Sequence, residues 1–262
     1  MSAERWGGLR AQIAQEAARI MYEECVKEYF TAKRIAAKRL LGRVQGRRLR
    51  YRPQDLPSNG EIRDALLALA ELAEGDRRMD RLFAMRVIGY ETMKALLPFE
   101  ARMIGSVSTG HVRRGSDIDL QVFSDDAEAL ESHLQALQWV FDKNVAMIQK
   151  HGTIREYTHY HVADVFPVEL TLYAARELRI RPRSSTDGKP IIRMGIAAVE
   201  TLLMREHSLR WQQYQRSGDI EGLEEWIHEP DGPAPGPFDG LMADMEPSLG
   251  RSMPQARQVE DT

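Results

Sequence analysis

The sequence predicts an α+β protein, in which a central part of mixed strands and helices lies between helical segments. Apolar residues recur at three- and four-residue steps through most of the first hundred residues, which is typical of helices. Between residues 118 and 173, short β-rich segments with alternating apolar and polar side chains are typical of strands. The helical period then returns at about residues 195–216.

The N-terminal segment is predicted to be helical. Residues 4–41 keep the helical period throughout, so we expect one long helix that ends before Gly42. Cys25 is the single cysteine of the chain, and we expect it to pack within this helix. One thiol cannot form an internal disulfide, which favours a reducing environment. Residues 42–58 have no clear period and contain glycines and prolines, which predicts a linker or an extended loop.

Two further helices are expected before the pattern changes. Ser58 or Asn59 can cap the first of them, which ends at Gly75. The second spans about residues 77–96 and ends before Pro98, because proline cannot continue a helix.

The central part is predicted to contain a small sheet. Residues 118–123 predict a strand, residues 126–140 a helix and residues 144–149 a further strand. Residues 154–162 and 165–173 are two β-rich segments joined by a short turn, and they predict a hairpin.

After the sheet, residues 182–190 predict a loop, residues 195–216 a helix and residues 219–228 a short helix. The chain from Glu229 onward is rich in proline and glycine and then polar, which predicts disorder. We therefore expect four parts: a helical N-terminal region (1–97), a core of mixed strands and helices (98–180), a C-terminal helical segment (181–228) and a disordered tail (229–262).

The overall composition excludes few functions. The 262 residues carry a net charge of −3, from 36 basic and 39 acidic residues, so the average charge indicates no nucleic-acid partner. No apolar segment approaches the ~20 residues that a membrane span needs, and the N-terminus lacks the apolar core of a signal peptide. We expect a cytoplasmic protein without a membrane partner.

The segment from Gly105 to Asp119 contains the first candidate catalytic groups. Asp117 and Asp119 flank Ile118 at the start of a predicted strand, so their carboxylates share one face, about 7 Å apart along the strand. Two carboxylates side by side repel each other and favour a cation such as Mg²⁺. Gly105 and Ser106 follow an apolar segment, where glycine lets the backbone approach a phosphate closely and serine adds a donor. The alternative is an ordinary solvated end of a strand.

A third carboxylate is needed if the site is to hold two metal ions. Glu169 lies between Val168 and Leu170 in a later predicted strand, and it points to the opposite face with Thr171. Three carboxylates can bracket two ions ~3.5–4 Å apart, one activating the acceptor oxygen and one steadying the leaving pyrophosphate. Asp164 is the rival third ligand, but it lies at a predicted turn, which suits aspartate for structural reasons. Glu169 could also be a surface residue on the open face of the sheet.

These motifs resemble the DNA-polymerase-beta-like nucleotidyltransferase superfamily, in the form of its minimal bacterial members. The shared pattern over roughly residues 98–180 is a glycine–serine pair, then ten intervening residues, an acid pair, and a single acid on a later strand: Gly105, Ser106, Asp117, Asp119 and Glu169. The resemblance implies a palm with a mixed β-sheet flanked by helices, two Mg²⁺ ions held by the three acids, and a nucleoside triphosphate such as ATP held by the glycine–serine pair. The helical N-terminal region is similar, more loosely, to that of uncharacterised bacterial proteins that pair such a region with this domain.

The chain departs from the family pattern in two respects. Glu169 stands where an aspartate is common, and its longer side chain must be accommodated. The segment after Ser106 carries His111, Arg113 and Arg114 in place of the usual acidic or proline residues.

Several polar residues near these acids have both a functional and a structural interpretation. Arg113 and Arg114 could bind phosphate oxygens, since a guanidinium donates a forked pair of hydrogen bonds, or they could lie on a solvated loop. Ser116 could contact the nucleotide, although a role in capping the loop before the acid pair is the simpler interpretation. His159 and His161 would share a strand face, but no zinc-binding signature accompanies them.

A basic segment spans residues 27–52. It contains ten lysines and arginines, opposed by Glu28 alone, and it includes Tyr29 and Tyr51. Such a segment can neutralise the phosphates of RNA, dock on an acidic partner protein, or form the solvated face of a helix.

The sequence therefore predicts a magnesium-dependent enzyme that transfers a nucleoside monophosphate from a nucleoside triphosphate to an acceptor, with RNA as one candidate. Asp117 and Asp119 would bind both ions, and Glu169 would complete the acceptor side and help to remove the proton of the hydroxyl group. Gly105 and Ser106 would hold the β- and γ-phosphates. One rival hypothesis is a protein acceptor, as in nucleotidyltransferases that are paired with toxins. Another is a nucleotide-binding regulatory module without turnover.

Overall fold

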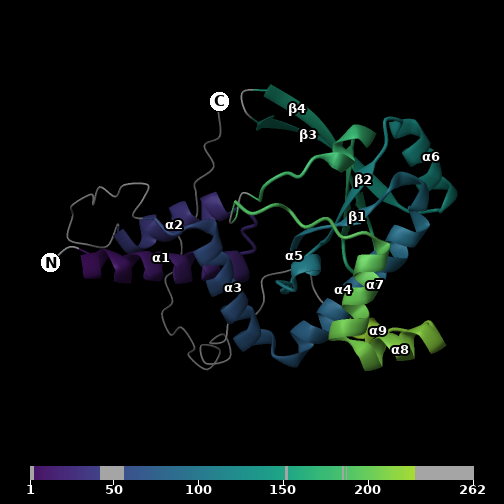
Figure 1. The fold of residues 1–262 in the computed structure, drawn as a ribbon. Helices are drawn as coiled ribbons and strands as arrows, with labels where there is room; N and C mark the ends of the chain where they lie inside the picture. Colours follow the sequence, from purple (N-terminus) through teal and green to yellow (C-terminus); the bar gives the residue numbers. More distant parts are fainter. Residues whose placement is uncertain (1–2, 42–55, 151–152, 185, 187, 228–262) are drawn as a thin grey trace, which may run out of the picture.

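The chain folds as an α+β protein, which confirms the predicted fold class. The computed structural model describes residues 3–41, 56–150, 153–184, 186 and 188–227. Within these ranges, helices flank a mixed five-stranded sheet, and a group of N-terminal helices forms a separate arm (Figure 1). No helix in the described ranges is both long enough and apolar enough to cross a membrane.

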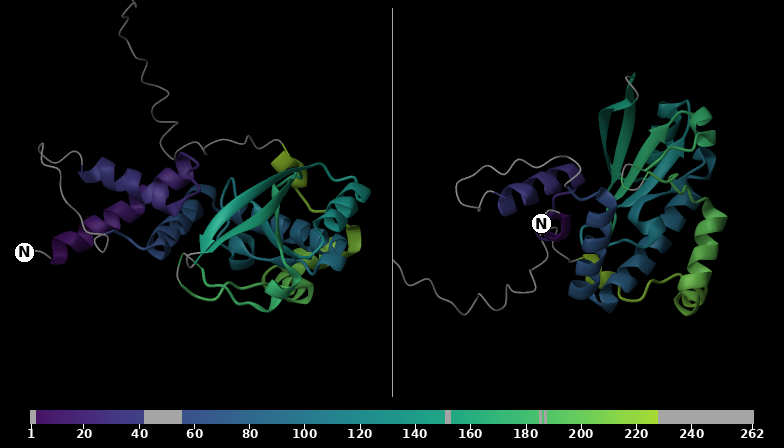
Figure 2. Two further views of the ribbon diagram at one scale, coloured as in Figure 1. Left: turned by 90° about the horizontal axis from the view of Figure 1, so that it is seen from above. Right: turned by 60° about the vertical axis from the view of Figure 1, so that its left-hand side comes forward.

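The arm consists of three helices: α1 (Ala3–Glu23), α2 (Tyr29–Leu41) and α3 (Asn59–Glu74). They share a hydrophobic core of their own, in which small side chains predominate; its fully buried members include Ile13, Ala17, Ile20, Ala32, Ala36, Ala37 and Ile62. Figures 1 and 2 show the arm at one side of the molecule.

The single helix predicted for residues 4–41 is wrong. The chain leaves α1 after Glu23 and enters α2 at Tyr29, and between them Cys25 has a φ of 54°, in the left-handed region that interrupts a helix. The break lets α2 fold back against α1, so that apolar residues of both helices enter one core. Cys25 is exposed at this break, so its predicted packing within a helix is also wrong.

The start of α3 follows the sequence signals closely. Ser58 is the cap: its Oγ accepts a hydrogen bond from the Glu61 amide at 3.2 Å, and Glu61 Oε2 accepts from the Ser58 amide at 2.7 Å. This reciprocal pair satisfies two amides that the helix itself leaves without partners. Glu61 also pairs with Arg10 of α1 at 2.5 Å, which joins the two helices.

The sheet has the strand order β1-β2-β5-β4-β3. Strand β1 (Arg102–Met103) is antiparallel to β2 (Ile118–Phe123), which is parallel to β5 (Val168–Tyr173). Strand β4 (Thr153–Val162) pairs antiparallel with both β5 and β3 (Phe141–Lys150). The predicted strand at β2 and the predicted antiparallel pair of β4 and β5 are confirmed.

The remaining helices are α4 (Asp76–Ala95), α5 (Gly105–Thr109), α6 (Ala127–Ala136), α7 (Ile196–Glu206), α8 (Ser208–Ser217) and α9 (Leu223–Ile227), with short 3₁₀ turns at Leu97–Phe99 and Ala175–Arg179. The helix predicted for residues 195–216 is divided at His207. Helices α4, α7 and α8 share one hydrophobic core with the sheet, whereas α3 belongs to the core of the arm.

The division into parts 1–97, 98–180, 181–228 and 229–262 stays a prediction. The boundary between the two hydrophobic cores falls between α3 and α4, inside the proposed N-terminal region rather than at its end. The tail predicted to be disordered lies outside the described residues, as does most of the predicted linker.

Candidate active site

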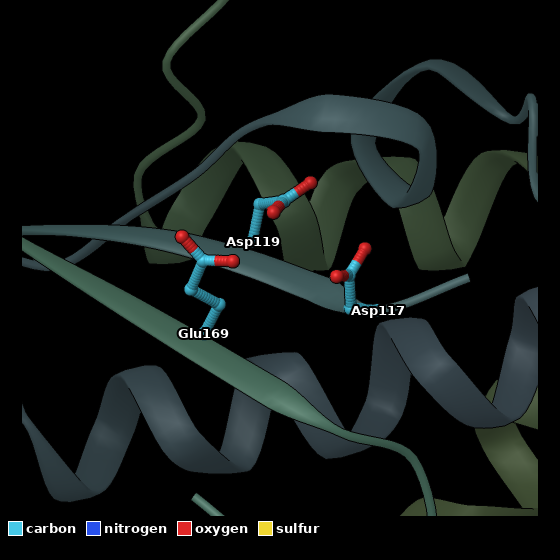
Figure 3. Close-up of side chains that lie close together, drawn as sticks. All are labelled: Asp117, Asp119 and Glu169. Atoms are coloured by element: carbon cyan, nitrogen blue, oxygen red, sulfur yellow. The ribbon is translucent and has the colours of Figure 1, made fainter. Parts of the chain in front are cut away.

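Three carboxylates from two neighbouring strands converge on one face of the sheet (Figure 3). Asp117 immediately precedes β2, Asp119 lies within it, and Glu169 lies in β5, where it pairs in register with Asp119. Each carboxylate offers one oxygen to a common position, and these three oxygens all lie within 4.8 Å of one another. The intervening Ile118 and the neighbouring Leu170 point to the opposite face and are fully buried. The structure thus brings together the three acids that the sequence analysis selected.

The charges of these acids act on one another. Burial, together with the nearby charges of Asp117 and Glu169, raises the pKa of Asp119 to about 7, and Lys27 opposes this shift. Like charges held this close destabilise the ionised state unless a cation neutralises them. The donor set consists of carboxylate oxygens, which are the ligands that Mg²⁺ prefers. The three residues therefore fit a divalent metal ion.

The raised pKa of Asp119 predicts a pH-dependent metal affinity. Protons compete with a cation for this carboxylate below about pH 7, so the affinity for Mg²⁺ should rise as the pH increases through that range. The pKa of the folded state lies above the value of about 3.9 for an unfolded aspartate, so the free energy of unfolding of the metal-free protein should fall between about pH 4 and pH 7. Thermal unfolding with EDTA and with Mg²⁺ at several pH values measures both effects. An equal increase in Tm on adding Mg²⁺ at about pH 5.5 and about pH 8.5 would contradict the assignment.

The turn at the start of α5 lies directly against the acid pair. Gly105 has a φ of 71°, and a Cβ atom at this position would overlap the Oδ2 of Asp119. The Ile104 amide donates a hydrogen bond to the backbone oxygen of Asp119 at 3.0 Å, which fixes the turn beside β2. Ser106 is half-buried in the first turn of α5. A glycine is therefore required at residue 105 for both conformation and space.

Substitution of Gly105 by alanine tests this close approach. Gly105→Ala should lower catalytic activity by at least about tenfold, because the added methyl group displaces the Asp119 carboxylate. Gly218→Ala is the matched control, since Gly218 also has a positive φ of 75° but has no atom within 4 Å of the added methyl group. Both variants should lose about 1 kcal/mol of stability. Equal activity losses in the two variants would show that the effect is not specific to the site.

Two buried arginines of α4 hold α5 in place. Arg86 Nε donates to the Val107 oxygen at 3.1 Å, and Arg78 Nη1 donates to the Gly110 oxygen at 2.8 Å. The charge of Arg86 is balanced by Glu206 of α7, whose Oε2 lies 2.6 Å from Nη1. Arg86 also contacts His207, and burial together with the guanidinium lowers the pKa of that imidazole to about 4. The position of α5 therefore depends on its contacts with α4, whose Arg86 is in turn paired with α7.

The loop between α5 and the acid pair is held by its own polar groups. The Arg113 amide donates to Ser116 Oγ at 3.0 Å, so Ser116 closes the turn that leads into Asp117. The Arg114 amide donates to Glu74 Oε1 at 2.8 Å, which ties the loop to α3. The Arg113 guanidinium donates to the Arg114 oxygen at 2.9 Å, and its burial lowers its pKa. These contacts favour the structural interpretation of Ser116.

A pocket of about 400 Å³ adjoins Gly105 and Ser106. Its walls come from α5 and the following loop, from α2 and α3 of the arm, and from Ser184, Thr186 and residues 189–192. The charged residues among its described lining are all basic: Arg63, Arg113 and Lys189. His111 also lines the pocket, and burial lowers its pKa. The pocket next to the acids is thus positively charged, which suits an anionic ligand.

His159 is a candidate site residue that the sequence analysis did not select. Its Nδ1 lies 2.5 Å from Glu169 Oε1 and 3.3 Å from Thr171 Oγ1. His159 lies on β4, beside the strand that carries Glu169, and its side chain is 17% exposed. The ring therefore limits the directions in which Glu169 can point. The alternation of β4 placed His159 on a common face with His161, but only the register with β5 reveals the contact with Glu169.

Removal of His159 should impair the site without unfolding the protein. His159→Ala should reduce turnover by about ten- to a hundredfold, because partners that orient ligand carboxylates have effects of this size. His159→Asn, which keeps a donor near the position of Nδ1, should recover part of the loss. The measurements are kcat at saturating Mg²⁺ and the apparent Mg²⁺ affinity. If His159→Ala keeps both values of the wild type, His159 has no role in positioning Glu169.

The arm also reaches the acids. Lys27 Nζ lies 3.2 Å from Asp117 Oδ2, and the lysine side chain is 73% exposed. Two other basic residues of the predicted segment are engaged within the arm, Lys33 with Asn59 and Arg39 with Glu24. Five further members, Arg43, Arg47, Arg48, Arg50 and Arg52, lie outside the described residues.

Comparison with known proteins agrees with the resemblance seen in the motifs. Residues 91–167 match the family model described as a nucleotidyltransferase domain, a range that includes Gly105, Ser106 and both aspartates. A search of curated proteins finds no match. Among solved structures, a chain from a "structure of GLD-2/RNP-8 complex" matches with 14% identity and a TM-score of 0.24, covering 71% of this chain and 73% of that chain. At this TM-score the two chains superpose only loosely.

Proposed function

We propose that the chain moves a nucleoside monophosphate from a nucleoside triphosphate to an acceptor hydroxyl. The match of residues 91–167 to the nucleotidyltransferase domain model supports this class of transferase. The observation that carries this proposal is the convergence of the Asp117, Asp119 and Glu169 carboxylates within 4.8 Å of one another. Gly105 packs directly against Asp119, at the edge of a positively charged pocket. Acids and a phosphate cradle side by side are the two parts that nucleotidyl transfer needs.

The three acids would hold Mg²⁺, with two ions as the proposed number. When bound, the metal supplies Lewis acidity at the phosphate and acceptor oxygens. Asp117 and Asp119 reach the proposed metal position from β2 and the residue before it, and Glu169 reaches it from β5. The metal position therefore has an aspartate side and a glutamate side. We assign the acceptor side to Glu169, whose contact with His159 holds the longer glutamate side chain in place.

Each protein group then has a defined task. The acceptor oxygen attacks the α-phosphorus, the bond to the β-phosphate oxygen breaks, and pyrophosphate leaves. Glu169 accepts the proton of the acceptor hydroxyl. Gly105 and Ser106 hold the β- and γ-phosphates, and Arg113 contributes a positive charge from the wall of the same pocket. Ser116 is assigned the task of orienting the loop before the acids.

For the acceptor we propose RNA. The support comes from the basic segment at residues 27–52, whose first residue, Lys27, lies beside Asp117. Basic residues close in sequence to one that lies at the acids can guide a polyanionic substrate to them. A protein acceptor is the alternative outcome of the test below.

A pyrophosphate-release screen tests the proposal. The full chain is incubated with Mg²⁺, each of the four nucleoside triphosphates labelled at the α-phosphate, and total cellular RNA or whole lysate. We expect pyrophosphate from at least one triphosphate and transfer of the label to RNA. Label on protein instead would replace RNA by a protein acceptor. Nucleotide binding without pyrophosphate release would overturn the enzymatic proposal and favour a regulatory module.

Two variants serve as controls for this screen. Asp119→Ala should abolish the signal, whereas Asp164→Asn should keep it. Asp164 accepts a hydrogen bond from the Val165 amide at 2.6 Å in an exposed turn, and asparagine can do the same. Asp164→Asn also distinguishes Glu169 from Asp164 as the third acid. Loss of activity in this variant would favour Asp164, the rival ligand.

A further inference from the structure

We propose that Lys27, in the N-terminal arm, is a further phosphate-binding residue of the active site. It lies outside the nucleotidyltransferase match at residues 91–167, and it would complete the site from a different part of the chain. This inference rests on the proposed function, since it assigns a ligand group of that same site.

Lys27 is placed at the acids by the break between α1 and α2. Its ammonium group lies 3.2 Å from Asp117 Oδ2, across 90 residues of sequence. The Asp117 side chain is 29% exposed and the Lys27 side chain 73% exposed, so the pair lies at the open edge of the acid cluster. A group at this edge can meet a ligand that enters from solvent.

The backbone around Lys27 is held in place although its side chain is exposed. At one end of the break, the Glu24 amide donates to the Ile20 oxygen of α1 at 3.0 Å. The Glu24 carboxylate also accepts a hydrogen bond from Arg39 of α2 at 2.6 Å. At the other end, the Ala32 amide donates to the Glu28 oxygen at 3.0 Å. These contacts therefore fix the backbone on both sides of Lys27, whereas the four-carbon side chain of Lys27 can change its conformation.

A second observation places the same segment beside the phosphate cradle. Tyr29, two residues after Lys27, lines the pocket that Gly105 and Ser106 also line. Arg63 and Leu66 of α3 line it as well. The arm thus contributes to both sides of the proposed triphosphate position, at the acids and at the glycine–serine pair.

The chemistry favours a phosphate as the ligand of Lys27 over a permanent pair with Asp117. A lysine–aspartate pair at the solvent edge of a site is weak, and it cannot compete with a divalent cation at three carboxylates. Once the charge of Asp117 is neutralised by a bound cation, the ammonium group is left beside the triphosphate. It has three donors and no acceptor, and phosphate oxygens supply the acceptors that it then lacks. Because the Lys27–Asp117 pair is weak, it also does not act as an inhibitory contact that excludes the metal ion.

Binding of inorganic triphosphate in the presence of Mg²⁺ tests the assignment without any need for turnover or a known base. Calorimetry on the full chain would compare the wild type with Lys27→Ala, Lys27→Arg and Lys38→Ala. Lys38 is an exposed lysine of α2 and serves as the matched control for loss of one positive charge from the arm. We expect Lys27→Ala to bind about tenfold more weakly, Lys27→Arg to recover part of the loss, and Lys38→Ala to match the wild type.

The outcomes separate this proposal from the enzymatic one. Equal triphosphate affinity in Lys27→Ala and the wild type would overturn the role of Lys27, and pyrophosphate release by the wild type would still support the proposed function. Tighter binding or faster turnover in Lys27→Ala would also overturn it and assign the arm an inhibitory contact. If the wild type bound triphosphate with the help of Lys27 but released no pyrophosphate from any nucleotide, the proposed function alone would fail. Unchanged Tm values confirm that each variant is folded.

Discussion

Replacement of Asp119 by asparagine is expected to reduce pyrophosphate release by at least about 10³-fold, because it removes the central carboxylate of the metal-binding set. The same change should raise the Tm of the metal-free protein at about pH 8, since it removes a buried charge repelled by both neighbours. The raised pKa of Asp119, about 7, reports that repulsion. A gain in stability that accompanies a loss of function is typical of a residue selected for binding a ligand rather than for folding.

The matched control is Asp126→Asn, which makes the same substitution after the other end of β2. Asp126 Oδ1 caps α6 by accepting from the Ala129 amide at 2.9 Å, and asparagine can cap in the same way. This variant should keep both activity and Tm. The assignment of Asp119 would not survive if Asp119→Asn retained wild-type turnover, or if its metal-free Tm at about pH 8 fell well below that of the wild type.

The faces of the site residues could be predicted from sequence because side chains on a strand alternate with a period of two. Ile118 and Leu170 are apolar and buried, so the acids next to them in each strand had to face the other way. The glycine–serine pair and the acid pair are close in sequence, and α5 with the loop that follows it brings them together. What the pattern could not supply is the strand order, which places β5 directly beside β2 and brings Glu169 opposite Asp119.

The errors of the sequence analysis have a common physical cause. The helical period continues through residues 24–28, so the pattern contains no sign that the chain turns back at Cys25. That turn is stabilised by packing of α2 on α1, a contact between segments that local periodicity does not describe. Lys27 and His159 were missed as site residues for the same reason. Their partners, Asp117 and Glu169, lie 90 and 10 residues away and are reached only through tertiary structure.

Glu169→Gln is expected to lower turnover by about 10²–10³-fold while changing the affinity for inorganic triphosphate much less. The reason is its position: Glu169 comes from β5 and contacts His159, whereas the glycine–serine pair lies beside Asp119 of the neighbouring strand. A residue on the acceptor side should affect the chemical step more than phosphate binding. Kinetics with saturating nucleotide, together with triphosphate calorimetry, measure the two effects separately.

Two further variants sharpen the interpretation of Glu169. Glu169→Asp keeps the charge but shortens the side chain by one methylene group, so the carboxylate moves away from His159 and activity should fall between that of the wild type and that of Glu169→Gln. Glu128→Gln, at an exposed position in the first turn of α6, makes the same change of glutamate to glutamine away from the sheet face and should match the wild type. Wild-type turnover in Glu169→Gln would remove the third acid from the mechanism. A loss of triphosphate affinity as large as that in Asp119→Asn would instead move Glu169 from the acceptor side to the nucleotide side.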